Sequence, residues 1–281
     1  MRRALLVPML LTAVAMLLVS CNRPDPDADI AAIRSLVESD TVHFKSGTAG
    51  DSTENGSLLD DTTVGLWWRG PQTHDPQATI EVTVEGDSAW VSWHQSNYGE
   101  FIHWVKTSDT TSTKWTKELV ERVQVNAVFR REAEETAEDR GWRFKRLSLA
   151  HGRSDTVSTV RIDSLRIQSS LRDVMIRNPL ETCYRPDSLV TFTPAEQLTM
   201  TLYTNVPEGR AFLHAFWLWI LVRAPFEHQG DGVYVGTWNA QLLPGFRFAI
   251  FDLISESTML EPDAPYDYCG WLFPYDVRNA D

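Results

Sequence analysis

The clearest pattern in the chain is an alternation of apolar and polar residues along positions 79–94, which predicts a β-hairpin. Gly86 and Asp87 fit a two-residue hairpin turn and fix how the two strands pair. Counting outward from the turn places six apolar side chains on one face: Ile80, Val82, Val84, Ala89, Val91 and Trp93. Trp90 and His94 fall on the other face, so one side of the hairpin is expected to be buried.

A second alternating run covers residues 117–131, and residues 142–150 are predicted to form its return strand. Between the hairpin and this run, the polar segment Ser96–Gly99 predicts a turn. Residues 100–106 would then run back as a separate strand. The first half of the chain is therefore predicted to be a long antiparallel meander.

A helix is predicted before the meander. Four apolar residues within positions 29–43 share one helical face: Ile30, Ile33, Leu36 and Val37. Asp27 or Asp29 is expected to cap its N-terminus. One helix followed by a long antiparallel meander resembles the NTF2-like (SnoaL-like) family over residues 30–152. The resemblance implies an α+β domain in which a helix-wrapped, curved sheet forms a cone. Members of that family are either small-molecule enzymes, such as isomerases and dehydratases, or non-catalytic binding and dimerisation modules.

The second half, residues 157–281, is expected to be all β. Short apolar runs alternate there with turn signals rich in Gly, Pro, Asn and Asp. The predicted strands are 160–167, 189–192, 198–203, 211–222, 233–238 and 246–254. Short strands at this spacing favour an immunoglobulin-like β-sandwich, with an irregular aromatic tail from Glu261 to Trp271. The predicted fold class is thus an α+β domain followed by an all-β domain.

The N-terminus has the features of a secretory signal. Arg2 and Arg3 precede an apolar core of about sixteen residues, which is shorter than the roughly twenty needed to span a membrane. The segment Leu18–Cys21 resembles the lipobox of bacterial lipoproteins. The resemblance implies cleavage after residue 20 and acyl chains such as palmitate on Cys21. An ordinary secretory signal with a chance cysteine is the alternative.

Lipidation would place the protein in a bacterial cell envelope. Residues 21–29 would then form a polar, proline-containing tether. The residue after Cys21 is Asn22, and not the aspartate that retains some lipoproteins on the inner membrane. This favours an outer-membrane position, on its periplasmic or surface face.

The net charge of the chain bears on which binding partners are expected. The chain of 281 residues has a formal net charge of −12, which becomes about −14 once Arg2 and Arg3 leave with the signal peptide. An acidic surface argues against nucleic-acid binding, which needs concentrated basic side chains. The expected partners are the membrane, through the lipid on Cys21, and an envelope protein or a small ligand. No cofactor is expected.

Cys183 and Cys269 are the cysteines that follow Cys21. An oxidising compartment favours one disulfide between them, which would stabilise the fold by roughly 4 kcal/mol in the entropic description. Two buried free thiols are the alternative. Two cysteines are too few for a metal site, so none is expected.

Candidate chemistry centres on His94 and His103. The turn predicted at residues 96–99 would place them roughly opposite each other on neighbouring strands, close to Trp90 and Trp104. On the concave face of a cone they could act as acid and base or contact a ligand, whereas on a solvated face they would be ordinary polar residues.

Other polar residues offer weaker signals. Asp40 could project into the cone as a base or remain an exposed acid at the helix end. Four acids could bind calcium, but simple solvation is the better account without an organised loop: Glu256, Glu261, Asp263 and Asp267. Eleven tryptophans could line a ligand surface, although core packing is the default.

These features favour a non-enzymatic lipoprotein that presents a binding surface to a protein partner or a small ligand. The first alternative is an NTF2-like enzyme of the isomerase or dehydratase type with a pocket near His94 and His103. The second is a structural subunit of an envelope assembly. Both histidines pointing into a deep cone would favour the enzyme.

Overall fold

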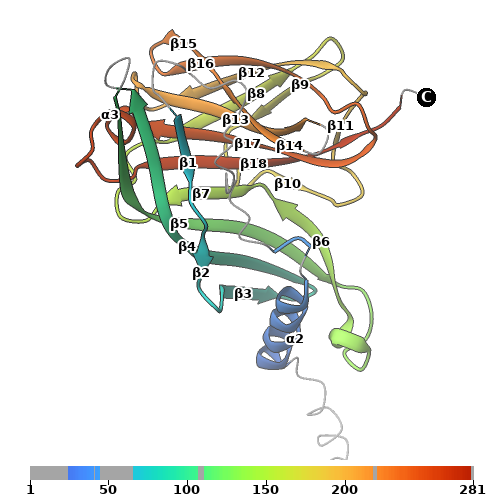
Figure 1. Cartoon of the computed structure of the whole chain (residues 1–281). Coiled ribbons are helices and arrows are strands. Elements are labelled where there is room, and N and C mark those ends of the chain that lie inside the picture. The colour runs from blue at the N-terminus through green and yellow to red at the C-terminus, as the bar shows by residue number, and fades with distance from the viewer. Residues whose placement is uncertain (1–24, 41, 45–65, 107–110, 218–219, 280–281) are drawn as a thin grey trace, which may run out of the picture.

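The computed structural model describes residues 25–40, 42–44, 66–106, 111–217 and 220–279. Within them, thirteen strands build one large sheet and five build a second sheet (Figure 1). The predicted signal peptide and Cys21 lie outside the described residues. No helix within the described ranges is long and apolar enough to cross a membrane.

Helix α2, Pro26–Ser39, begins earlier than predicted. Asp25 accepts a hydrogen bond from a first-turn backbone N–H at 3.2 Å, and Pro26 takes the first helical position, where its missing N–H costs nothing. Both predicted caps are wrong, because Asp27 lies within the first turn and Asp29 is buried. The predicted tether is therefore helical from Pro26 onward.

The predicted hairpin is confirmed. Strands β3 (Thr79–Glu85) and β4 (Ser88–Lys106) pair across a turn at Gly86, with Val82 opposite Val91. Gly86 has a φ of 57°, a conformation that glycine adopts without steric cost. The apolar face of the hairpin packs against α2 in one buried cluster, which includes Ile33, Val37, Ala89, Val91 and Trp93.

Strand β4 does not turn at Ser96–Gly99 as predicted, but continues without a break. Its partner β5 (Ser112–Arg131) pairs with it along the entire length. The glycine that suggested a turn instead marks a close approach of backbone. A Cβ atom at Gly99 would lie 3.2 Å from Cγ of Gln72 and 3.3 Å from the carbonyl oxygen of Pro71.

Short strands complete both sides of the β4–β5 pair. On the β4 side, β3 is followed by β2 (Thr73–His74) and β1 (Leu66–Arg69). On the β5 side lie β6 (Trp142–Ser148), which follows a short 3-10 turn, and β7 (Ala150–Ser154). Strand β10 (Cys183–Tyr184) pairs with β6.

Strand β18 (Tyr268–Val277) is the largest departure from the prediction. The predicted tail is irregular only as far as residue 267, because from Tyr268 onward it forms a strand that pairs with β7 on one side and with β17 (Gly245–Ser255) on the other. Strand β17 pairs with β13 (Gly209–Trp217), β13 pairs with β14 (Ile220–Pro225), and β11 (Val190–Phe192) runs parallel to β18. One sheet thus runs across the predicted domain boundary.

The predicted fold class is therefore wrong. An NTF2-like cone and a separate immunoglobulin-like sandwich would each close on themselves, whereas here β7 and β18 share one ladder, with Gly152 opposite Gly270. The described residues contain only two α-helices, α2 and α3 (Glu256–Leu260), which are too few to wrap a cone. The single strand predicted over residues 211–222 is instead the β13–β14 hairpin.

The second sheet covers one face of β13, β17 and β18. Its strands, in spatial order, are β15 (Glu227–Gly230), β16 (Val233–Asn239), β12 (Gln197–Thr204), β8 (Ile162–Gln168) and β9 (Asp173–Ile176). Side chains of both sheets share one buried cluster, which includes Leu165, Met200, Leu202, Leu213, Phe251, Trp271 and Phe273. This part of the molecule is two β-sheets packed face to face.

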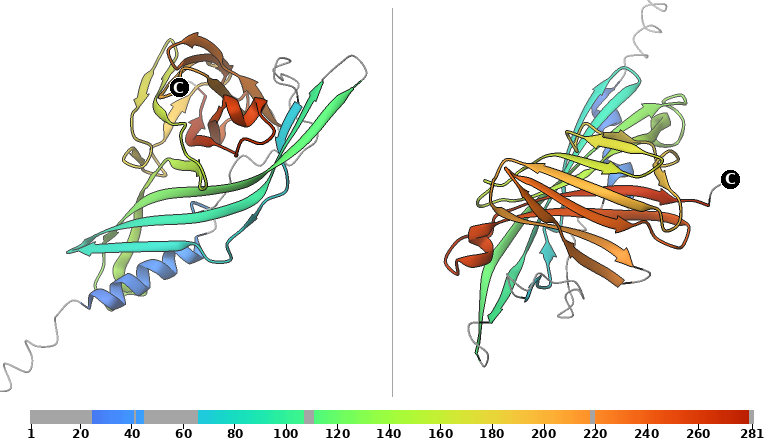
Figure 2. Two further views of the ribbon diagram at one scale, coloured as in Figure 1. Left: turned by 90° about the vertical axis from the view of Figure 1, so that its left-hand side faces the viewer. Right: turned by 90° about the horizontal axis from the view of Figure 1, so that it is seen from above.

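The other face of the large sheet is curled inwards, and we call it the concave face (Figure 2). Leu119 on β5 and Ile254 on β17 share a buried cluster there, because the sheet bends back on itself. Helix α2 packs against the same face further along β3, β4 and β5. In Figure 1, α2 lies at the end of the molecule away from the second sheet.

Candidate functional site

The two predicted histidines do not meet. Because β4 is continuous, His94 and His103 lie nine positions apart on one strand, and an odd spacing sends their side chains to opposite faces. His94 bonds Ser92 at 3.0 Å on the partly exposed face. His103 is fully buried against the ring of Trp115 at 4.8 Å. No shared pocket forms around them.

Trp90 and Trp104 share the outward face of β4 with His94, and each is 45 % exposed. Trp104 contacts the ring of Trp68 edge-on at 6.2 Å. Most of the other described tryptophans are buried and pack in the core, including Trp67, Trp142 and Trp271. The predicted grouping of Trp90 and Trp104 with both histidines is therefore not formed.

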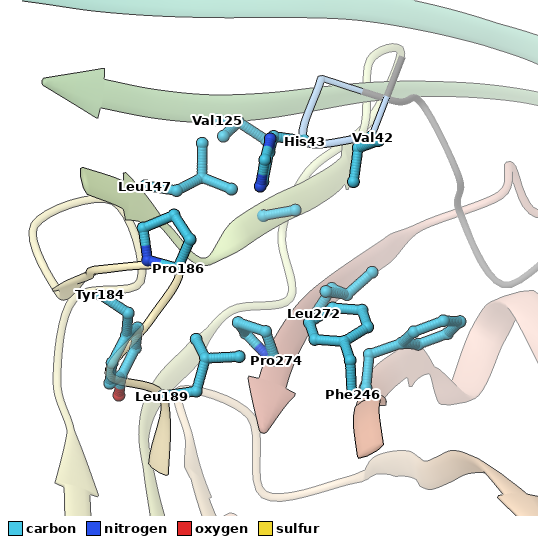
Figure 3. A pocket seen from close by; sticks show the side chains of 12 residues that line it. Val42, His43, Val125, Leu147, Tyr184, Pro186, Leu189, Phe246, Leu272 and Pro274 are labelled. Carbon is cyan, nitrogen blue, oxygen red and sulfur yellow. The ribbon is translucent and has the colours of Figure 1, made fainter. Parts of the chain in front are cut away.

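A cavity of about 580 Å³ lies on the concave face, between the end of α2 and strands β17 and β18 (Figure 3). Its walls come from far-apart segments and are mainly apolar, with contributions from Val125, Leu147, Leu189, Phe248, Leu272 and Pro274. It opens to solvent beside Val42 and Phe246, which are 73 % and 60 % exposed. Its volume falls in the range of small-molecule sites.

Polar side chains are rare in this cavity. Of the twelve residues that line it, only His43 and Tyr184 carry a polar side-chain atom. Burial raises the pKa of Tyr184 to about 12, so its hydroxyl stays neutral. Figure 3 shows that hydroxyl directed away from His43.

The ring of His43 is held by Asp40, which ends α2. Oδ2 of Asp40 lies 2.7 Å from Nδ1 of His43, while Oδ1 accepts the backbone N–H groups of Val42 and His43 at 2.9 Å each. Burial opposes ionisation of Asp40, but these backbone and side-chain hydrogen bonds outweigh it and lower its pKa. The His43 ring also lies 4.8 Å from the ring of Phe144.

The residues of this site were only partly visible in the sequence. The sequence suggests Asp40 as a base inside a cone or as an exposed acid, and it is neither, because it is half-buried and orients His43. His43 itself was missed. The available signal was an Asp and a His three positions apart in the last turn of the predicted helix, a spacing that lets the side chains meet.

A second polar group lies at the closed end of the concave face and is sealed from solvent. Arg69 on β1 pairs with Glu121 on β5 at 3.1 Å and with Asp252 on β17 at 2.8 Å. Tyr266 donates to Glu121 at 2.7 Å, and Nε2 of His214 lies 2.9 Å from Asp252. These side chains are 0–1 % exposed, so a ligand has no access to them.

The two carboxyl groups of this buried cluster have opposite pKa shifts. Burial raises the pKa of Glu121 despite the nearby Arg69. Burial acts on Asp252 as well, but Arg69 and His214 together hold its pKa well below the ordinary range. The cluster is therefore a charged cross-link inside the protein.

The predicted disulfide is not formed, since Cys183 and Cys269 are both free thiols in the structure. Cys269 lies in the core on β18, 1 % exposed, while Cys183 is half-buried on β10 at the sheet edge. Burial raises the pKa of both thiols, that of Cys269 to about 12. The alternative of two buried free thiols matches Cys269, whereas Cys183 is only half-buried.

The acids near the C-terminus do not gather around an ion. The loop after α3 instead wraps the ammonium of Lys117, which donates to the carbonyl oxygens of Glu261 and Ala264, the latter at 2.7 Å. Asp267 is buried and accepts the backbone N–H of Thr159 at 3.0 Å. Over the described ranges, no three His, Cys, Asp or Glu residues lie together as a metal site would require.

Comparison with known proteins adds no relative. No family model matches the chain, and no curated protein matches it. The geometry of the cavity is therefore the basis for a functional proposal.

Proposed function

We propose that this protein is a non-enzymatic, lipid-anchored binding protein of the bacterial cell envelope whose apolar cavity holds an apolar small ligand. The resemblance of Leu18–Cys21 to a lipobox supports the anchor. The observation that carries the proposal is an open, mostly apolar cavity of about 580 Å³ on the concave face.

Apolar walls favour an apolar ligand for a simple physical reason. Each methylene group moved out of water contributes about 0.8 kcal/mol, and a mostly apolar wall imposes little desolvation cost of its own. The exposed side chains of Val42 and Phe246 at the mouth allow a ligand to enter from solvent. A hydrocarbon chain fits these features better than a sugar or a charged metabolite.

The pairing of His43 with Asp40 supports a second candidate, an enzyme that uses His43 for acid–base chemistry. A carboxylate that orients an imidazole is a recurrent catalytic arrangement. However, no Ser, Thr, Cys, Asp or Glu is among the described residues that line the cavity, and the Tyr184 hydroxyl points away from His43, so no described nucleophile lies where His43 could activate it. We therefore favour binding without chemistry.

A cavity-filling variant tests the proposal. Leu147→Trp places an indole in the cavity, and Leu171→Trp makes the same change at a position that is 67 % exposed, in the turn between β8 and β9. Binding of an environment-sensitive fluorophore with a hydrocarbon tail would be measured by titration. We expect the Leu147→Trp variant to bind at least tenfold more weakly and the Leu171→Trp variant to bind like the natural chain. Equal binding by both variants would rule out the cavity as the site.

A further inference from the structure

Among the described residues that line the cavity, His43 has an imidazole held by two ring contacts and by a backbone hydrogen bond. Nδ1 of His43 lies within hydrogen-bond distance of the Asp40 carboxylate, at 2.7 Å, and the backbone N–H of His43 donates to the same carboxylate at 2.9 Å. The centre of the Phe144 ring lies 4.8 Å from that of the imidazole. A ring held in this way loses little further freedom when it binds a ligand.

The second ring nitrogen of His43 is left for a ligand. Among the described residues, Nε2 has no hydrogen-bond partner. Figure 3 shows the ring lying close to Val125 and Leu147 at the cavity wall. Because Asp40 is ionised and accepts from Nδ1, the neutral ring would present Nε2 as an acceptor, and the protonated ring would present it as a donor.

We infer that the cavity binds a long-chain carboxylic acid whose head group pairs with Nε2 of His43 and whose hydrocarbon chain lies along the apolar wall. The inference rests on the proposed function and names the ligand class for the same site. The carboxyl group can give its proton to Nε2, and the resulting imidazolium then lies between the ligand carboxylate and Asp40. The contact at Nε2 then joins two ionised groups, and a charge-assisted hydrogen bond of this kind is about twice as strong as a neutral one.

Other amphiphiles fit the polar end of the cavity less well. A phosphate head group would carry more negative charge and calls for Arg or Lys, yet none of the described lining residues is basic apart from His43. An ester has no proton to donate to Nε2, and an alcohol donates only a neutral hydrogen bond. The acid is therefore expected to bind more tightly than an ester or alcohol of equal chain length.

Three twelve-carbon ligands test the inference: dodecanoic acid, methyl dodecanoate and dodecan-1-ol. Titrations at pH 6 would use the chain from residue 21 onward, with Cys21→Ser to prevent lipid attachment. We expect the acid to bind about tenfold more tightly than the ester or the alcohol, the ratio given by one charge-assisted hydrogen bond. Equal affinities for the three ligands would overturn the inference and leave the proposed function standing. No binding by any of them would overturn both.

Substitution of His43 provides a second test of the inference. His43→Phe keeps the packing against Phe144 and removes both ring nitrogens, and His74→Phe makes the same change at an exposed position on β2. The preference for the acid should disappear in the His43→Phe variant, with ester affinity within about twofold of the natural chain, and should persist in the His74→Phe variant. In the natural chain, the ¹⁵N signal of His43 Nε2 should shift with the acid and not with the ester. Retained preference in the His43→Phe variant, or an unmoved Nε2 signal, would refute the pairing.

Discussion

Arg69 donates from Nη1 to Oδ2 of Asp252 across 2.8 Å, although the two residues lie 183 positions apart and both are sealed from solvent. The pair joins β1 to β17 at the point where the concave face folds onto itself. The pair therefore closes the end of the concave face that lies opposite α2. The cavity is the open part of that face, between this ion pair and α2.

Removing the charge of Arg69 should strongly destabilise the fold. Arg69→Met would leave Asp252 and Glu121 buried without their cation, and breaking one partner of a buried pair typically costs about 3–5 kcal/mol. Urea unfolding would measure the loss. Arg166→Met, which breaks an exposed pair with Asp173, should leave the unfolding midpoint close to that of the natural chain. Similar midpoints for both variants would contradict this account of the cluster.

Asp29 should be important for holding α2 in place. Its buried carboxylate accepts from Arg140 at 2.7 Å, from Arg131 at 2.5 Å and from the Trp142 indole at 3.2 Å. Asp29→Asn would weaken these charge-assisted bonds and lower the unfolding free energy by about 2 kcal/mol, as measured by urea unfolding. Because α2 leads into Val42 and His43, ligand affinity should fall as well.

The matched control for this prediction is Asp27→Asn, two residues earlier in the same helix. Asp27 is exposed and has no buried partner among the residues that the structure describes, so both stability and ligand affinity should stay near their natural values. A control variant as unstable as Asp29→Asn would show that the loss reflects helix charge and not the buried contacts.

His151 should make the fold acid-sensitive. Burial, assisted by Arg153, lowers the pKa of His151 to about 4 from an ordinary 6.5. Its folded pKa lies below its unfolded pKa, so the contribution to stability is complete above pH 6.5 and is lost as the pH falls towards 4. Between pH 7.5 and pH 5 the unfolding free energy should fall by roughly 2 kcal/mol from this group.

Substituting His151 tests its contribution to acid sensitivity. The fall in unfolding free energy between pH 7.5 and pH 5, measured by urea unfolding, should be smaller by roughly 2 kcal/mol in the His151→Gln variant. His74→Gln, at an exposed position, should leave the decrease unchanged. An identical pH dependence in the His151→Gln variant would assign the acid sensitivity to other groups.

Cys269 should be chemically inert in the folded protein. Its thiol is 1 % exposed and its pKa is raised to about 12, so little thiolate is available for alkylation. Peptide mass spectrometry after iodoacetamide treatment should find Cys269 unmodified in native buffer and fully modified in guanidinium chloride. A peptide pair linked through Cys183 and Cys269, two hydrogens lighter than the free thiols, would instead establish the disulfide.

Local patterns in this sequence predicted local structure well. The hairpin around Gly86 was placed correctly because its turn and its alternation lie within sixteen adjacent positions, and each residue supports the same register. The helix was found for the same reason, from its apolar face. Its first turn was missed because Asp25 and Pro26 lie in a stretch whose prolines suggested an extended tether.

Features that depend on distant contacts were not predictable in this way. Gly99 resembles a turn residue in sequence, and only the chain passing beside it shows that it marks a close approach. The tail around Tyr268 becomes a strand because β7 and β17 lie on either side of it. The cavity combines residues from Val42 to Pro274, so no single window of sequence contains its pattern.

The position of β18 between β7 and β17 has a consequence for biogenesis. A ribosome releases residues 268–277 long after residues 150–154, so the ladder between Gly152 and Gly270 cannot form until almost all of the described chain has been made. Until then β7 has an unpaired edge, which is a natural target for chaperones and for aggregation.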